Sequence, residues 1–197
     1  MAAGAKPGMR VLDCCAAPGG KSFAAAIAMQ NEGSVTSCDI HAHKVSLIEK
    51  GAARLGVSIV HARQADASQF EPEFEAGFDV VIADVPCSGL GVIRKKPDIR
   101  YKDLAPMQKL PQVQAAILEN VSRYVKPGGV MVYSTCTVLK RENENVANAF
   151  LARHPEFRLE VFALPAGLDA QTDGMLTLYP HLHEADGFFI CKLRKNV

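Results

Sequence analysis

The sequence has few of the features that mark a membrane, secreted or metal-binding protein. It contains no run of about 18 apolar residues, the length that a membrane-spanning helix needs. The first residues, MAAGAKPGMR, lack the apolar core of a signal peptide. The six cysteines form no CxxC pair and no regular spacing, so neither a disulfide framework nor a metal site is predicted. Free thiols are typical of a reducing compartment and favour a cytoplasmic protein.

The chain also lacks a large net charge. With 22 basic and 21 acidic side chains it carries +1 at pH 7, which excludes attraction to nucleic acid by overall charge and leaves that role to a local patch. Its 197 residues fit one domain without an internal repeat or a linker. The pattern specifies no oligomeric state.

The most informative stretch is MRVLDCCAAPGGK, residues 9–21. A short apolar segment leads through Asp13 and small residues into a Pro-Gly-Gly turn, and the Ala-rich run SFAAAIAMQ follows directly. A buried strand that enters a glycine turn and then a helix is typical of an α/β sheet that binds a nucleotide at its carboxyl edge. The GxGxxG spacing of dinucleotide binders is absent, so a tight turn that binds no ligand is the alternative.

Strands and helices alternate along the rest of the chain. Strands are predicted at residues 35–39, 58–63, 78–84 and 130–135, and less distinctly near 157–162 and 187–193. Helices are predicted after residue 41 up to Gly56, over 107–125 with a closing KPGG turn at 126–129, and over 140–153. This order predicts a Rossmann-like, doubly wound and mostly parallel sheet of seven strands.

Three aspartates lie at or just past the ends of successive predicted strands: Asp39, Asp66 and Asp84. Asp39 lies where a nucleoside cofactor presents its ribose hydroxyls, and Asp66 is suited to accept a hydrogen bond from an adenine amino group. A single aspartate at such a place is usually a turn or capping residue. Three beside a Pro-Gly-Gly turn favour a nucleoside cofactor, and the missing GxGxxG favours S-adenosylmethionine over a nicotinamide dinucleotide.

Two cysteines also follow strands. Cys87 lies in DVPCSGLG after the fourth strand, and Cys136 lies in YSTCT after the fifth. If those strands are adjacent and parallel, both thiols emerge at one rim near the cofactor. A buried cysteine usually serves as a small hydrophobic residue, which is how we interpret Cys14, Cys38 and Cys191. The Ser, Thr, Pro and Gly neighbours of Cys87 and Cys136 favour catalysis instead.

DCCAAPGGK, the three aspartates, DVPCSGLG and STCT together resemble the RNA cytosine-5 methyltransferases of the Nol1/Nop2/Sun family. KPDIRYK and DGFFICKLRK extend the likeness over nearly the whole chain, and it is strongest to the bacterial members that modify small-subunit ribosomal RNA. The resemblance implies that residues 1–197 form a class I S-adenosylmethionine-dependent methyltransferase domain acting on RNA. Because it also implies an upstream RNA-binding region, we expect the chain to be a fragment of a longer protein.

The resemblance further implies roles for individual residues. Cys136 is the implied nucleophile, which forms a covalent adduct at carbon 6 of cytosine, and Cys87 is implied to assist release of the methylated RNA. Val85 stands where the family more often has alanine. The implied cofactor contacts are Cys15, Ala16, Ala17, Pro18, Gly19, Gly20, Lys21, Asp39, Asp66 and Asp84.

Two charged residues complete the predicted catalytic site. We expect Asp84 to hydrogen-bond the ring nitrogen 3 or the exocyclic amine of the cytosine, and Lys21 to orient Asp84 through an ion pair. Lys21 or cations of the loop after Cys87 are also expected to lower the pKa of Cys136 and so to raise its reactive thiolate fraction.

The segment RKKPDIRYK, residues 94–102, carries five basic side chains and one acidic one. We predict that Arg94, Lys95, Lys96, Arg100 and Lys102 contact phosphates and that Tyr101 stacks on a base. A solvated surface loop is the alternative, but the position directly after Cys87 favours RNA binding. His181 and His183 have no partner pattern and are interpreted as loop residues rather than metal ligands.

Two other functions compete with this reading. A nicotinamide-dependent oxidoreductase is disfavoured because neither GxGxxG nor a hydride-transfer site is recognisable. An RNA-binding module without catalysis is disfavoured because it would not need both Cys87 and Cys136.

Overall fold

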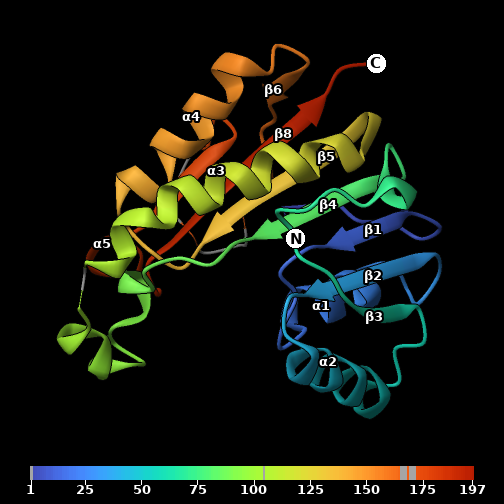
Figure 1. Cartoon of the computed structure of the whole chain (residues 1–197), viewed down its shortest axis with the longest axis horizontal. Helices are drawn as coiled ribbons and strands as arrows, with labels where there is room; N and C mark the ends of the chain where they lie inside the picture. The colour runs from blue at the N-terminus through green and yellow to red at the C-terminus, as the bar shows by residue number, and fades with distance from the viewer. Residues whose placement is uncertain (1, 104, 165–167, 169–171) are drawn as a thin grey trace.

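Five parallel strands form the larger part of one sheet in the computed structural model, which describes residues 2–103, 105–164, 168 and 172–197. They are β1 (Arg10–Asp13), β2 (Ser34–Asp39), β3 (Val60–Gln64), β4 (Phe78–Asp84) and β5 (Val125–Thr135), in the order β3-β2-β1-β4-β5 (Figure 1). β8 (Phe188–Lys195) runs antiparallel beside β5, and both β6 (Phe157–Leu159) and β7 (Met175–Leu178) pair antiparallel with β8. The doubly wound, mostly parallel sheet is therefore confirmed, with β7 as an additional strand beyond the seven predicted.

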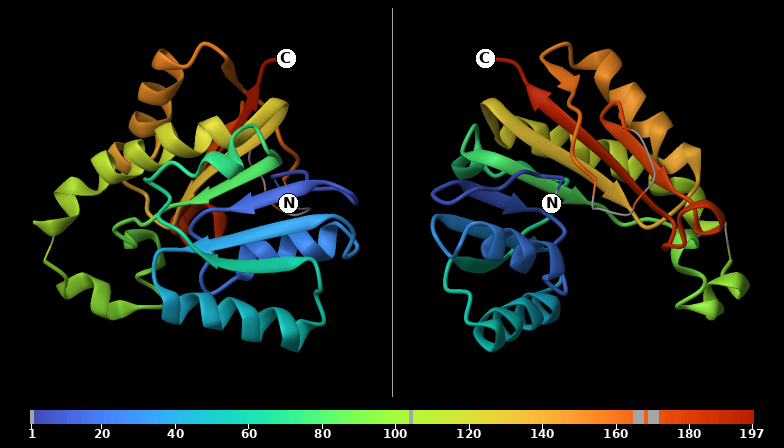
Figure 2. Two further views of the ribbon diagram at one scale, coloured as in Figure 1. Left: turned by 45° about the vertical axis from the view of Figure 1, so that its right-hand side comes forward. Right: turned by 180° about the vertical axis from the view of Figure 1, so that it is seen from behind.

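Helices cover both faces of the sheet, as Figure 2 shows. α1 (Gly20–Ala28) and α2 (Ala42–Leu55) lie on one face, and α3 (Leu110–Val121) and α4 (Glu144–Arg153) lie on the other. Side chains alternate along β4, so that Val80 and Ile82 pack with the first pair of helices and Val81 and Ala83 with the second. The other helical elements are α5 (Pro180–His183) and short 3-10 turns at Pro72–Phe74, Leu90–Val92, Pro97–Tyr101, Pro106–Lys109, Ser122–Tyr124 and Lys140–Glu142.

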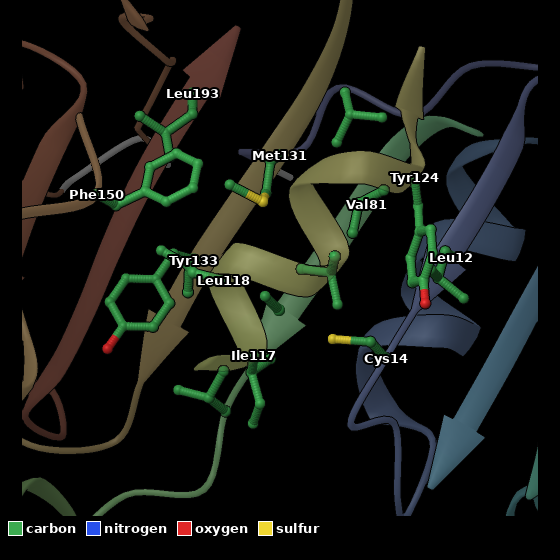
Figure 3. Close-up of a cluster of buried hydrophobic side chains, with 14 of the residues drawn as sticks. Leu12, Cys14, Val81, Ile117, Leu118, Tyr124, Met131, Tyr133, Phe150 and Leu193 are labelled. Carbon is green, nitrogen blue, oxygen red and sulfur yellow. The ribbon is translucent and has the colours of Figure 1, made fainter. Parts of the chain in front are cut away.

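The core on the α3 side joins neighbouring strands to both of its helices (Figure 3). Leu12 of β1 and Met131 of β5 belong to one buried cluster with Leu118 of α3. Complete burial of a leucine contributes about 1.5–3 kcal/mol to folding, so this cluster holds the site-bearing strands firmly in register. The three cysteines predicted to be core thiols, Cys14, Cys38 and Cys191, are buried here.

Several element boundaries differ from those predicted. α3 is shorter than the predicted helix over 107–125, because its ends are 3-10 turns and Pro111, which lacks an N–H, lies in its first turn. The KPGG segment does not precede the fifth strand but lies inside β5 as an irregularity, where the partner of Phe78 is Val125 and the partner of Val80 is Val130. The predicted helix over 140–153 begins as a 3-10 turn, and α4 starts at Glu144.

The carboxyl ends of the parallel strands lie along one edge of the sheet. The strand order reverses at β1, which lies between β2 and β4, and such a switch point opens a crevice at that edge. The predicted catalytic and cofactor residues lie at or just past the ends of β1, β2, β3, β4 and β5 at this edge. The segment after β4, residues 86–109 with Leu104 outside the described residues, extends away from the arrowheads of these strands (Figure 1).

Candidate active site

A cavity of about 410 Å³ lies beside the ends of β1, β2 and β3. Asp39 and Asp66 supply its carboxylates, and Ala65, Val113 and Ile117 are among its apolar walls. Asp39 is buried and accepts a hydrogen bond from the His41 backbone N–H on one carboxylate oxygen, at 3.0 Å. In Asp66, too, only one oxygen is engaged: Oδ1 accepts hydrogen bonds from the Ser68 backbone N–H and hydroxyl. Within the described residues, Oδ2 of each carboxylate accepts no hydrogen bond, so both remain available to a ligand.

The glycine turn lines a second hollow of about 190 Å³, and Cys15 borders both hollows. Gly19 has a φ of 109°, and a Cβ there would lie 2.3 Å from the Phe23 ring, so only glycine fits this turn. The two hollows together are lined by every predicted cofactor residue except Gly19. The residues are Cys15, Ala16, Ala17, Pro18, Gly20, Lys21 and Asp84, with Asp39 and Asp66 in the larger hollow.

Asp13 also lines the smaller hollow, and sequence reasoning did not single it out. Its side chain is fully buried, and Oδ2 accepts a hydrogen bond from Ser22 at 2.7 Å. Oδ1 is buried without a hydrogen-bond partner among the described residues. Burial raises the pKa of Asp13 to about 7. A buried, unpaired carboxyl oxygen beside a hollow suits a ligand with an N–H donor.

Asp84, at the end of β4, has a partner for each carboxylate oxygen. Lys21 Nζ lies 2.5 Å from Oδ2, which is the predicted ion pair, and Ser134 Oγ donates to Oδ1 at 2.7 Å. Lys21 also lies over the Phe188 ring, 5.1 Å from its centroid. Ser134 and Phe188 were not predicted. Because both charged side chains are about a third exposed, this pair orients Asp84 more than it stabilises the fold.

The thiols of Cys87 and Cys136 are in contact, with 3.1 Å between the two Sγ atoms. The hydrogen bond from Cys87 is the main reason that the pKa of Cys136 is lowered, to about 7, and the Lys21 charge contributes less. The pKa of Cys87 is raised, because its thiol donates to Cys136 and is buried. The predicted direction for Cys136 therefore holds, but its main cause is the second cysteine rather than a cation.

The lowered pKa of Cys136 predicts that this thiol is unusually reactive near neutral pH. With a pKa of about 7, roughly half of Cys136 is thiolate at pH 7, compared with about 3% for an ordinary cysteine. We expect the rate of Cys136 alkylation by iodoacetamide, followed by peptide mass spectrometry, to rise with a midpoint near pH 7. In the variant Cys87→Ala the midpoint should move upward, because the thiolate loses its hydrogen bond. An unchanged midpoint in that variant would contradict the assigned cause.

The basic segment after Cys87 is partly tied down. Lys95 lies 2.5 Å and Arg94 3.8 Å from Asp186, in the loop before β8. Tyr101 is 87% exposed. The Lys96, Arg100 and Lys102 side chains are exposed, whereas Ile99 is buried and anchors the segment. RNA contact by this segment stays a prediction.

His181 and His183 were expected in a loop, but both lie in the short helix α5. The Tyr179 backbone N–H donates to His183 Nδ1, at 3.0 Å. Across the described ranges, no group of three or more His, Cys, Asp or Glu residues is placed to hold a metal ion. No helix of the described part of the chain is long and apolar enough to cross a membrane.

The chain is similar to known proteins in both sequence and structure. The family described as 16S rRNA methyltransferase RsmB/F matches residues 2–194. The chain is 47% identical over 193 residues to the probable ribosomal RNA small subunit methyltransferase B of Bacillus subtilis, an alignment that covers 94% of this chain and 43% of the relative. The chain thus spans less than half the length of that curated relative.

The chain is also similar to proteins of known structure. NSun6 from Pyrococcus horikoshii, crystallised with SFG, is 31% identical with a TM-score of 0.82, over 95% of this chain and 48% of that one. A SAM-dependent methyltransferase from Aquifex aeolicus is 14% identical with a TM-score of 0.62, over 98% and 85% of the two chains, and it shows the shared fold alone.

Proposed function

Since the chain belongs to the 16S rRNA methyltransferase RsmB/F family, we propose that it methylates carbon 5 of a cytosine in small-subunit ribosomal RNA through a covalent adduct at Cys136. The observation that carries this proposal is the contact between the Cys87 and Cys136 thiols beside the ion pair of Asp84 and Lys21.

S-adenosylmethionine is the cofactor, and when bound it supplies an electrophilic methyl group. The residues at the strand ends fit it. Asp39 would accept hydrogen bonds from the ribose hydroxyls, and Asp66 would accept one from the adenine amino group. The unpaired Oδ1 of Asp13 would accept from the ammonium of the amino-acid end. The glycine turn lets the backbone approach closely.

The chain's own residues account for activation of the cytosine. Carbon 5 is a poor nucleophile, and attack of the Cys136 thiolate on carbon 6 breaks the aromaticity of the ring and makes carbon 5 enamine-like. Asp84, held by Lys21 and Ser134, would accept a hydrogen bond from the exocyclic amine and orient the ring or, when it carries a proton, donate to nitrogen 3 and stabilise the negative charge that this attack creates. After carbon 5 has accepted the methyl group, a base such as solvent water takes the carbon 5 proton. The electron pair of that C–H bond re-forms the double bond between carbons 5 and 6 as Cys136 leaves as a thiolate. Cys87, in contact with Cys136, would assist that release.

The RNA must present an unstacked cytosine to reach a thiol at the sheet edge, so we place the target in a single-stranded or flipped-out position. Arg94, Lys95, Lys96, Arg100, Tyr101 and Lys102 would contact the flanking RNA. Because the relatives are about twice as long, we propose that their additional region supplies further RNA binding. We place this activity in the cytoplasm, where its free cysteines stay reduced.

Calorimetry tests the cofactor site without RNA. Titration of S-adenosylmethionine should give binding that Asp39→Ala weakens by about tenfold or more, because two ribose hydrogen bonds are lost. The matched control is Glu49→Ala, which removes an exposed carboxylate of α2 and should leave the affinity within about twofold. A titration with NADH should show no binding. Binding of NADH in place of S-adenosylmethionine would overturn the cofactor and the function together.

A further inference from the structure

Two adjacent polar residues, Glu142 and Asn143, lie buried beneath the loops that carry the two cysteines. They belong to the turn between β5 and α4, and each has an exposed fraction of 0%. Neither lines the two hollows of the cofactor site. The hydrogen bonds of their side chains go instead to the neighbours of Cys87 and Cys136.

Glu142 fixes the loop that carries Cys87, both before and after the cysteine. Its Oε2 accepts from the Ser88 backbone N–H at 2.9 Å and from Gln114 Nε2 at 3.1 Å. Gln114 Nε2 also donates to the Pro86 carbonyl at 3.0 Å. One carboxylate oxygen therefore fixes the residue after Cys87 directly and the residue before it through a buried glutamine of α3.

Asn143 does the same for Cys136. Its Nδ2 donates to the Thr137 carbonyl at 3.0 Å, and its Oδ1 accepts from Thr135 Oγ1 at 2.5 Å. A further hydrogen bond, from Ser88 Oγ to Thr137 Oγ1 at 2.8 Å, joins the two loops to each other. Both neighbours of each cysteine are thus held by one short turn.

Burial of these groups is costly, which indicates a specific use. A carboxylate removed from water loses its hydration, and Glu142 Oε1 is buried without a hydrogen-bond partner in the described part of the chain. A turn that only connects β5 to α4 does not need a buried carboxylate. Contact between two thiols on different loops gives such groups a use, because a displacement of about 1 Å would break the thiol hydrogen bond.

We infer that Glu142 and Asn143 are positioning residues: each fixes the two neighbours of one cysteine, and together they hold the Cys87 and Cys136 thiols in contact. This inference rests on the proposed function, which gives those thiols their roles. It adds two residues to the site that touch neither cofactor nor cytosine.

The test measures the thiols directly. In Asn143→Asp the donor to the Thr137 carbonyl is lost, so the loops separate and Cys136 loses the hydrogen bond from Cys87. We expect alkylation of Cys136 at pH 7 to slow by about tenfold and its pH midpoint to rise toward that of an ordinary cysteine. Glu142→Ala should act in the same direction, and Glu142→Gln, which keeps an acceptor for Ser88, should restore most of the reactivity.

Three controls separate positioning from general damage. Asn145→Asp makes the same change at an exposed residue of α4 and should alter neither the midpoint nor the rate. S-adenosylmethionine affinity should stay within about twofold in every variant, since neither Glu142 nor Asn143 lines the cofactor hollows. If Asn143→Asp fails to fold, Ser88→Ala removes only the hydroxyl that joins the loops and should shift the midpoint upward by a smaller amount.

A folded Asn143→Asp or Glu142→Ala variant with an unchanged midpoint would overturn the inference. So would an unchanged midpoint in Ser88→Ala if it were the only folded variant. Because these measurements need no RNA, a wild-type domain that methylated no cytosine would count against the proposed function and leave the thiol result intact.

Discussion

Replacement of Cys136 by serine is expected to reduce methyl transfer to RNA by about 10³-fold or more, because a hydroxyl is almost never ionised near pH 7 and cannot replace a thiolate nucleophile. S-adenosylmethionine affinity should stay within about twofold, since Cys136 does not line the cofactor hollows. Transfer of a labelled methyl group to small-subunit ribosomal RNA measures the first quantity, and calorimetry measures the second.

The second cysteine provides the matched control. Cys87→Ala leaves the nucleophile in place, although with a raised pKa, so the first attack still occurs while release is impaired. We expect a covalent RNA–protein adduct that survives denaturing electrophoresis. The double variant with Cys136→Ser should form none. An adduct in the double variant would contradict Cys136 as the nucleophile, and no adduct in Cys87→Ala would remove Cys87 from product release.

The parts of this site that follow strands were predictable from the sequence. Asp39, Asp84, Cys87 and Cys136 each lie at or just past the end of a predicted strand. Parallel strands end at one edge, so the assembly of these residues there needed only the strand order. The Lys21–Asp84 ion pair was predictable for the same reason, because the glycine turn after β1 and the end of β4 adjoin in this fold.

The supporting contacts were not predictable, because they join residues far apart in the chain. Ser88 and Glu142 are 54 positions apart in the chain. The segment RENEN, residues 141–145, looks like the exposed start of a helix and gives no sign that Glu142 and Asn143 are buried. Ser134 lies in an apolar strand, where its hydroxyl gives no sign of a bond to Asp84. β7 is only four residues long and was missed because MLTL carries no clear alternation.

Replacement of Asp84 by asparagine should lower the turnover number by about 10²–10³-fold, with a much smaller effect on S-adenosylmethionine affinity. Asparagine keeps the size of the side chain, but it cannot form the ion pair with Lys21 and has no carboxyl proton to give to nitrogen 3 of the attacked ring. The matched control is Asp79→Asn, because Asp79 lies on the same strand at the opposite edge and pairs with Lys126 at 3.0 Å. Its turnover number should stay within about twofold of wild type. Near-normal turnover in Asp84→Asn would rule out the role.

Thiol alkylation distinguishes a catalytic Asp84 from one that merely activates Cys136. The Asp84 charge raises the pKa of Cys136 and the Lys21 charge lowers it, so loss of the carboxylate should make the thiolate more abundant at pH 7. Asp84→Asn is therefore expected to alkylate faster at Cys136 and yet transfer methyl groups more slowly. Changes of opposite sign would place the contribution of Asp84 after thiolate formation, in stabilisation of the attacked cytosine. A parallel loss of both rates would instead assign the defect to the nucleophile.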